Sequence, residues 1–318
     1  MRYILSALLL GLAACSVLAV EPGVDAGSFA RFGVGARALG MGGAFVALAD
    51  DGTAGYWNPA GLAGLSGWTL AGMYTDKFSQ GIQYQFLSAA GSFGSLGLGV
   101  SLIRQAIEDI PFYGDGEGET FSEYQTLWMA SLSFAPELEG VGMFLGGNIK
   151  YYVHEILEGK GQGLGFDLGL LVKITEEWGG LSFGLVSRDV RGTQIRWKGT
   201  DQEPINHVPW INTFGLAVSS WEDRLRLIGD VDIAIGRPRL NRVHLGAEIW
   251  PVHELGIRGG FVRWLEDGTT LLSAGATVRL GYISLHYSFM PHPVLGPSHM
   301  FSIELTWATE EESPKVEQ

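Results

Sequence analysis

The chain has 318 residues, of which 47 are glycine, 46% are hydrophobic and 17% are charged, and its formal net charge is −13. This apolar, aromatic-rich composition excludes intrinsic disorder, and the excess of acidic residues argues against nucleic-acid binding. The charged fraction is low for a soluble protein, in which about 25% is typical. Outside the extreme N-terminus, no apolar run approaches the roughly 18 residues that a membrane helix needs. The composition therefore favours β-strands in which apolar and polar residues alternate.

The first residues have the pattern of a secretory signal peptide, with Arg2 before a short apolar stretch and small residues after it. Two ways of processing are open. General cleavage after Ala19 would remove residues 1–19, whereas cleavage before Cys15, in a lipobox-like sequence, would leave a lipid-modified cysteine. We favour general cleavage, because the rest of the chain is able to anchor itself. Cys15 is the only cysteine, so neither case allows an intrachain disulfide.

Residues 20–67 differ from the rest of the chain and are rich in glycine and alanine. Glycines permit tight packing in a narrow space, and Asn58 before Pro59 is typical of a turn that its side chain stabilises. This segment is predicted to plug the lumen of a barrel, either as a filler that makes the barrel rigid or as a gate. The candidate plug or gate residues are Gly40, Gly42, Gly43, Asp50, Asp51, Asn58, Pro59 and Ala60.

Residues 68–307 divide into segments of about ten residues in which apolar and polar residues alternate. In several segments one face carries the charges and the other is nearly free of them. This asymmetry favours a membrane β-barrel with a hydrated lumen over a soluble β-sandwich. The predicted strands are 68–76, 82–91, 94–106, 123–135, 141–154, 162–174, 180–190, 210–220, 224–235, 240–250, 254–264, 269–280, 281–290 and 298–307.

The fold class is thus all-β: a transmembrane antiparallel barrel of about fourteen strands, an even number as in single-chain bacterial barrels, with a short N-terminal plug. Bacterial barrels place short turns in the periplasm and longer loops outside. The long connections predicted here, 107–122, 191–209 and 291–297, all follow odd-numbered strands. They are therefore expected to lie on one side of the membrane.

The connection after the third strand carries alternate carboxylates at Asp115, Glu117 and Glu119. A divalent-cation site is one interpretation, but we favour a solvated loop and expect neither a metal nor a cofactor. Residues 308–318 form an acidic tail that is predicted to be disordered.

Charged residues on the predicted lumenal face carry both signs on neighbouring strands. We favour a lattice of salt bridges that stiffens the barrel and holds the plug; the alternative is that some arginines bind a ligand carboxylate. Ser284, His286 and Ser288 share one strand face, which is ordinary for a lumen, so no enzyme is expected. The predicted network consists of Arg224, Arg226, Asp230, Asp232, Arg242, His244, Glu248, Arg258 and Arg279.

The stretches Gly35–Phe45 (GARALGMGGAF), Ala49–Asp51 and Trp57–Leu62 (WNPAGL) resemble the N-terminal block of PorV/PorQ-family outer-membrane proteins, which are relatives of FadL-type transporters of hydrophobic compounds. For the FadL type, the resemblance implies a fourteen-stranded barrel plugged by this segment. It also implies a ligand that passes from an external pocket through the hatch and leaves by a lateral gap in the wall. The chain is shorter than typical transporters of that type, which argues against a large external pocket.

Two functions are open. We favour passive passage of hydrophobic or amphipathic small molecules through a plugged lumen. The alternative, which the resemblance to PorV/PorQ proteins implies, is an interaction scaffold of a protein secretion system of the type IX kind. Either function places the chain in the outer membrane of a Gram-negative-type cell, with its N-terminus in the periplasm. The expected partners are outer-membrane lipid and either a hydrophobic ligand or secretion-system proteins, and no nucleic acid.

Overall fold

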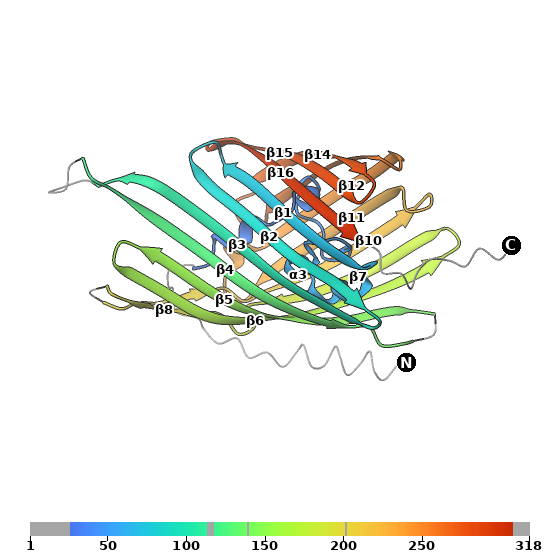
Figure 1. Cartoon of the computed structure of the whole chain (residues 1–318), viewed down its shortest axis with the longest axis horizontal. Coiled ribbons are helices and arrows are strands. Elements are labelled where there is room, and N and C mark those ends of the chain that lie inside the picture. The colour runs from blue at the N-terminus through green and yellow to red at the C-terminus, as the bar shows by residue number, and fades with distance from the viewer. Residues whose placement is uncertain (1–25, 113–117, 139, 201, 308–318) are drawn as a thin grey trace.

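The protein forms a closed antiparallel β-barrel in a computed structural model that describes residues 26–112, 118–138, 140–200 and 202–307 (Figure 1). Fourteen strands complete the ring, because β7 pairs with β10 and β16 pairs with β1. This confirms the predicted fold class. The ring consists of β1 (Trp68–Lys77), β2 (Ile82–Phe93), β3 (Leu96–Pro111), β4 (Thr120–Phe134), β5 (Gly142–Ile156), β6 (Gly159–Glu176), β7 (Gly179–Arg188), β10 (Ile211–Ser220), β11 (Leu225–Ala234), β12 (Arg242–Val252), β13 (Leu255–Trp264), β14 (Thr270–Leu280), β15 (Ile283–His292) and β16 (Gly296–Trp307). The predicted signal peptide, residues 1–19, and the acidic tail, residues 308–318, lie outside the described residues.

Successive side chains of a strand point to opposite faces, so the alternation of the sequence becomes an inside and an outside. In β11, Leu227 and Ile233 are exposed on the outer surface, whereas Ile228, Asp230 and Asp232 are buried. The same pattern recurs around the ring, where leucines, valines and aromatic residues are exposed on the outside. An uncovered apolar outer surface of this kind suits contact with lipid.

The connections at one end of the barrel differ from those predicted. Residues 191–209 contain a further hairpin, β8 (Thr193–Lys198) and β9 (Ile205–Val208), in which β8 pairs with the beginning of β6. The predicted long connection at 291–297 is only a short turn, because β15 and β16 extend until His292 faces Gly296. Pro291 and Pro297 face each other across this ladder.

The N-terminal segment, residues 26–67, lies inside the barrel (Figure 1). Its side chains and those of the inward-facing strand positions form one apolar core, in which Val34, Met41 and Phe45 are fully buried. No helix in the described part of the chain is both long and apolar enough to cross a membrane. The helices are η1 (Phe29–Phe32), α2 (Ala36–Leu39), α3 (Ala54–Trp57), η2 (Pro59–Gly64) and η3 (Pro238–Leu240), the last of which connects β11 to β12.

The segment runs from one end of the barrel to the other. Its first described residue, Ala26, donates its backbone N–H to His207 O at the end that carries the β3–β4 and β8–β9 hairpins. Its last residue, Gly67, leads into β1 at the opposite end, where the turns are short. We call these ends the hairpin end and the short-turn end.

Candidate functional site

Inward-facing glycines of the wall allow the backbone of the segment to touch the strands directly. A Cβ atom at Gly184 would overlap the carbonyl of Val46, one at Gly246 would lie 2.5 Å from Met41 O, and one at Gly260 would overlap Met41 as well. Such approaches leave no room for any side chain. Part of the glycine excess therefore serves the docking of one segment. The wall glycines in contact with it are Gly97, Gly146, Gly169, Gly184, Gly215, Gly246 and Gly260.

The predicted Asn-Pro turn joins three parts of the molecule. Asn58 is fully buried, and its Oδ1 accepts a hydrogen bond of 3.2 Å from Ala60 N in its own turn. Its Nδ2 donates to Val46 O at 3.0 Å and to Leu170 O, on β6, at 3.1 Å. Pro59 begins the helix η2, a position where its missing N–H is not needed. The turn thus ties the segment both to itself and to the wall.

The predicted glycine turn lies against β12, β13 and β14. Gly42 N donates to Ser273 Oγ at 2.9 Å, and His244 Nδ1 donates to Gly42 O at 2.7 Å. Gly42 has a φ of +69° and Gly43 one of +77°, a conformation that favours glycine. A Cβ at Gly40 would lie 2.9 Å from Arg258 Cδ, so this third glycine provides space for an arginine of the wall.

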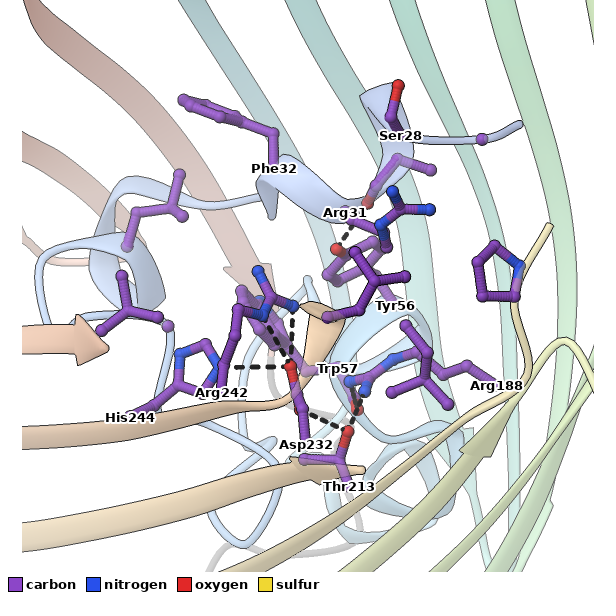
Figure 2. Close-up of a pocket in the computed structure, with 18 of the residues that line it drawn as sticks. Ser28, Arg31, Phe32, Tyr56, Trp57, Arg188, Thr213, Asp232, Arg242 and His244 are labelled. Carbon is purple, nitrogen blue, oxygen red and sulfur yellow. Dashed lines mark hydrogen bonds and ion pairs between the residues drawn. The ribbon is translucent and has the colours of Figure 1, made fainter. Parts of the chain in front are cut away.

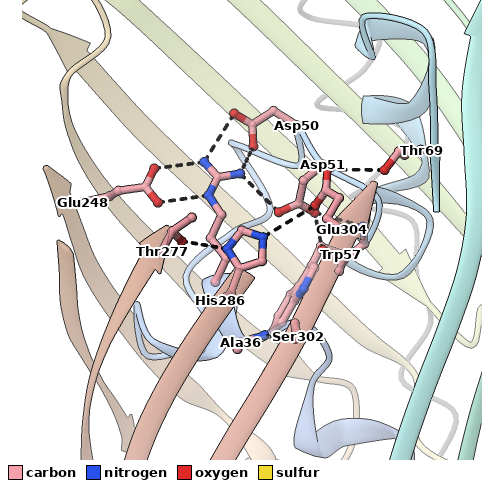
Figure 3. A network of polar contacts seen from close by, with 12 residues as sticks. Ala36, Asp50, Asp51, Trp57, Thr69, Glu248, Thr277, His286, Ser302 and Glu304 are labelled. Carbon is pink, nitrogen blue, oxygen red and sulfur yellow. Dashed lines mark hydrogen bonds and ion pairs between the residues drawn. The ribbon is translucent and has the colours of Figure 1, made fainter. Parts of the chain in front are cut away.

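The guanidinium of Arg37 binds the segment to the wall. Figure 3 shows its carboxylate partners Asp50, Asp51 and Glu248. It donates two parallel hydrogen bonds of 2.9 Å to the carboxylate of Glu248 on β12. Its Nη1 also lies 2.6 Å from Asp50 Oδ1 and 3.1 Å from Asp51 Oδ2. The sequence predicted the three carboxylates but missed Arg37. The available signal was its isolation as the one charged residue in a stretch of small residues, residues 33–49.

These contacts set the charges of the segment. Although burial by itself lowers the pKa of Arg37, Asp50 and Glu248 hold it well above its ordinary value. Burial by itself raises the pKa of Asp50, but the positive charges of Arg37 and Arg226 outweigh this and lower it to about 2. For Asp51, burial and the neighbouring Asp50 prevail over Arg37, and its pKa is raised. The adjacent aspartates therefore differ in their protonation behaviour.

Glu248 is the centre of the predicted network on the short-turn side. Besides Arg37, its Oε2 lies 3.1 Å from Arg226 Nη1 and its Oε1 lies 3.6 Å from Arg258 Nε. Arg226 also lies 3.5 Å from Asp50 Oδ2, and Arg258 donates to Thr277 Oγ1. Three arginines, of which only Arg37 was not predicted, thus surround Glu248.

Asp232 collects a second group nearer the hairpin end. Its Oδ2 accepts from Arg242 Nε at 3.0 Å and from Nη2 at 2.7 Å, and it lies 3.2 Å from His244 Nε2. Its Oδ1 accepts from Thr213 Oγ1 at 2.7 Å. Its neighbour on the same face, Asp230, accepts the backbone N–H groups of Phe45 and Val46 at 2.7 and 2.9 Å. Strand β11 therefore anchors the segment through Asp230 and binds its two neighbouring strands, β10 and β12, through Asp232.

Two predicted members lie away from these groups. Arg224 is in the exposed turn that precedes β11, with its guanidinium 5.8 Å from the centre of the Trp221 ring. Arg279 stacks on the ring of Trp250 at 4.3 Å, near the short-turn end. The alternation of apolar and polar residues continues from the lumen to the ends of the strands. It therefore does not distinguish a lumenal position from one at the rim of the barrel.

A third charged group was not predicted. Lys150 Nζ on β5 lies 3.2 Å from Asp167 Oδ1 and 2.6 Å from Asp189 Oδ2, and Asp189 also accepts from Tyr152 and Thr193. Asp189 has a φ of +51° and directly follows β7, where the chain bends toward β8. The group holds this bend against the wall.

A cavity of about 330 Å³ lies between the segment and the hairpin end (Figure 2). Its floor includes Gly43 and Trp57, and most of its wall is apolar or aromatic. Arg188 borders it and is already bonded to Trp57 O at 2.8 Å and to Thr213 Oγ1. Other lining residues are Phe32, Tyr56, Lys77, Leu127, Met129, Val262, Trp264, Leu271 and Met290.

Two further hollows lie on the short-turn side of the segment. One, of about 500 Å³, includes Thr69, Arg279 and Glu304; the other, of about 660 Å³, includes Lys173 and Ala217. Asp50 borders both. The segment therefore separates the cavity from these two hollows, which we call the β1 vestibule and the β10 vestibule.

The described residues hold no group of three or more His, Cys, Asp or Glu side chains placed for a metal ion. Asp115 and Glu117 of the acidic loop lie outside the described residues. His286 Nδ1 lies 2.7 Å from Thr277 Oγ1, and Ser288 Oγ faces Met300 Sδ. The structure thus gives His286 and Ser288 partners other than each other.

Residues 29–166, fewer than half of the chain, match a family model described as Uncharacterised protein family (UPF0164). A search of curated proteins gives no match. Among solved structures, the chain is similar to the toluene transporter TbuX of Ralstonia pickettii, with a TM-score of 0.57, 12% identity, and coverage of 86% of this chain and 98% of that one. It is also similar to the CymD monoaromatic hydrocarbon channel (TM-score 0.55, 13% identity, 87% and 98% covered) and to the toluene transporter TodX of Pseudomonas putida (0.53, 12%, 86% and 96%). At these identities the likeness is one of fold.

Proposed function

We propose that this protein is an outer-membrane channel for hydrophobic or amphipathic small molecules, and that the N-terminal segment is its plug. The observation that carries the proposal is a mainly apolar cavity enclosed by a barrel whose outer surface is also apolar. An engineered cavity of about 150 Å³ binds benzene, so a cavity of about 330 Å³ accommodates a one-ring or short-chain molecule. The structural neighbours named toluene transporters and a monoaromatic hydrocarbon channel support this class of ligand.

The orientation follows from the two ends of the barrel. Bacterial barrels direct short turns to the periplasm, which places the hairpin end and the cavity outside and both vestibules in the periplasm. The first described residues lie at the hairpin end, within the barrel. In this orientation Ala26 lies at the external end. The periplasmic N-terminus predicted from the sequence is therefore not part of the proposal, and the residues before Ala26 lie outside those described.

The predicted plug residues and charge network have a role in this proposal. Arg37, Glu248, Asp230 and Asn58 fix the segment across the lumen, so that the closed state is the stable one. Because most charged groups that border the cavity are paired within the protein, the apolar wall determines which molecules bind.

A secretion scaffold of the PorV/PorQ kind is the alternative function, and it rests on the resemblance of the N-terminal block. It predicts that exported proteins co-purify with the barrel after mild detergent extraction. It also predicts that filling the cavity has no effect on function, since a scaffold acts through its outer surfaces.

The test places a larger side chain in the cavity, and the neighbouring residue on the same strand, β14, provides the control. Leu271 lines the cavity, whereas its neighbour Leu272 is 62% exposed on the outer surface. We expect Leu271→Trp to reduce uptake of toluene and of octanoate by about tenfold, because the indole occupies the ligand's space. Leu272→Trp is the matched control and should change uptake by less than about twofold. Equal uptake by both variants and the unchanged protein would refute the channel proposal.

A further inference from the structure

The segment is docked closely where it meets β7, β10, β12 and β13, as it also is at Gly97 of β3 and Gly146 of β5. There the backbone of residues 41–47 touches the wall glycines, and Asp230 accepts two of its backbone N–H groups. No side chain lies between the two backbones at Gly184 and Gly246, so no rotamer change opens a gap. Opening on this side requires displacement of the whole turn.

The opposite side, along β1, β15 and β16, retains empty space. A small hollow lies between Gly35 and Ala36 of the segment and Ala71 and Ser302 of the wall. It shares Arg37, Asp51, His286 and Glu304 with the β1 vestibule. The small hollow, of about 10 Å³, therefore adjoins the β1 vestibule beside the segment.

The inward-facing residues of β1 show how little separates this hollow from the cavity. Thr69 borders the β1 vestibule, Ala71 the small hollow and Lys77 the cavity. Only Met73 and Thr75 of this row lie between them, and both are buried. Methionine is unbranched and adapts its shape readily. The closure along β1 thus consists of one flexible side chain, Met73, and one small side chain, Thr75.

The other two strands of this side repeat the arrangement. On β15, His286 borders the small hollow and Met290 the cavity, with buried Ser288 between them. On β16, Met300 lies two residues before Ser302 on the same face and is fully buried. Met73, Met290 and Met300 all belong to the apolar core that contains Val34.

The part of the segment that covers this route is a short strap, residues 27–35. Val34 stands between Gly33 (φ +100°) and Gly35 (φ +79°), and Gly27 has a φ of +67°. Glycines in this region have alternative conformations of similar energy, so both ends of the strap are able to turn. The strap ends directly before α2, which Arg37 holds to Glu248. Two hydrogen bonds tie the strap to the rest of the segment, from Trp57 Nε1 to Val34 O at 3.0 Å and from the Tyr56 hydroxyl to Ala30 O at 2.6 Å. Movement of the strap breaks these two bonds and leaves the ion pair of Arg37 with Glu248 in place.

We infer that molecules pass from the cavity to the β1 vestibule between the strap and the wall of β1, β15 and β16, past Val34, Met73 and Met300, while residues 36–67 stay in place. This route rests on the proposed function. It excludes passage into the β10 vestibule as the main path.

Two buried alanines at matching depth test the route. Ala71 on β1 borders the small hollow and is 9% exposed; Ala217 on β10 borders the β10 vestibule and is 6% exposed. In proteoliposomes, we expect a bulky methanethiosulfonate reagent to label Ala71→Cys and to reduce toluene uptake by about tenfold. Labelled Ala217→Cys should keep uptake within about twofold, and the unchanged chain treated with the reagent controls for other reactions.

The outcomes separate the route from the function. Block through Ala217→Cys alone would place the path on the other side, and block through neither variant would place it away from both vestibules; either result overturns the route. Failure of Ala71→Cys to be labelled while uptake proceeds would also overturn it. Absence of uptake by the unchanged chain would instead refute the proposed function.

A disulfide lock provides an independent test. A Cβ at Gly55, in α3, would lie 3.6 Å from Ser131 Cβ on β4, which suits a disulfide. The double variant Gly55→Cys/Ser131→Cys ties residues 36–67 to the wall and leaves the strap free. We expect uptake within about twofold of the reduced form after oxidation, with heat-modifiable gel migration as the control for folding. Loss of uptake that a reductant restores would mean that the whole segment has to leave, and would overturn the inference.

Discussion

The N-terminal segment contacts the barrel differently on its two sides. Toward β7 and β10–β13, backbone meets backbone at wall glycines, and carboxylates of the wall bind its N–H groups and Arg37. Toward β1, β15 and β16, side chains such as Met73 and Met300 fill the space, and the hydrogen bond of 2.8 Å from Ala36 N to Ser302 Oγ is a neutral one. The same segment is thus fixed on one side and covered by adaptable side chains on the other.

This difference shows that two kinds of contact hold the segment to the barrel wall, one that is costly to break and one that is easily exchanged. Charge-assisted hydrogen bonds are strong when buried and costly to leave unmade. Contacts of methionine side chains are weak individually and are exchanged without breaking hydrogen bonds. The route proposed above depends on this division, because it requires the first kind of contact to hold while the second kind is exchanged.

Removing the main anchor should have the largest effect. Arg37→Ala leaves Glu248 without its bidentate partner, and breaking a buried ion pair typically costs about 3–5 kcal/mol. We expect a lower urea midpoint of unfolding and an increased leak of small hydrophilic dyes through the barrel. Arg239→Ala is the control, because Arg239 is 87% exposed and 3.7 Å from Glu266. An unchanged leak in Arg37→Ala would show that the fixed side does not depend on this arginine.

An added methyl group should affect stability differently on the two faces of β13, the face docked against the segment and the outer face. A Cβ at Gly260 would overlap the backbone of Met41, whereas the nearest atom to a Cβ at Gly259 is Ser273 O at 3.7 Å. We expect Gly260→Ala to lower the free energy of unfolding by about 1–3 kcal/mol through overpacking, and Gly259→Ala to change it by less than about 0.5 kcal/mol. Similar unfolding curves for the two variants would contradict direct docking at Gly260.

Low pH should also weaken the contacts that Asp50 makes with Arg37 and Arg226, with a smaller effect on stability than the two substitutions above. The pKa of Asp50 in the folded protein is about 2, below the ordinary value near 3.9. Its contribution to stability is therefore present above about pH 4 and is lost as the pH falls toward 2. The raised pKa of Asp51 has the opposite sign, since its contribution is lost as the pH rises. We expect urea midpoints measured from pH 5 to 2 to fall less steeply for Asp50→Asn than for the unchanged chain.

Asp51→Asn is the matched control for this measurement. It should leave the slope below pH 4 as steep as in the unchanged chain, and it should be the better tolerated of the two substitutions at neutral pH. Parallel slopes for Asp50→Asn and the unchanged chain would show that Arg37 and Arg226 do not hold Asp50 ionised.

The strands were predictable because alternation with a period of two is a local property. All fourteen predicted strands are present, and Asp230, Asp232, His244 and Glu248 are buried on the inside as the pattern required. The β8–β9 hairpin was missed because it is short and pairs with the beginning of β6, beyond its immediate neighbours. Residues 291–297 were predicted to be a long connection, because the sequence does not show that Pro291 and Pro297 face each other in a ladder.

The sequence by itself therefore determined the barrel, its inward-facing charges and the presence of a compact glycine-rich segment. The tertiary structure decided which groups meet. Arg37 and Glu248 are 211 residues apart, and Phe45 and Asp230 are 185 apart. The alternation along a strand shows which side of the barrel a residue faces, but it does not show which residue it contacts. That contact depends on the depth of each residue along the lumen, which is set only when the whole ring closes. For the same reason, only the structure distinguishes Gly260, which accepts the segment, from Gly259, which does not.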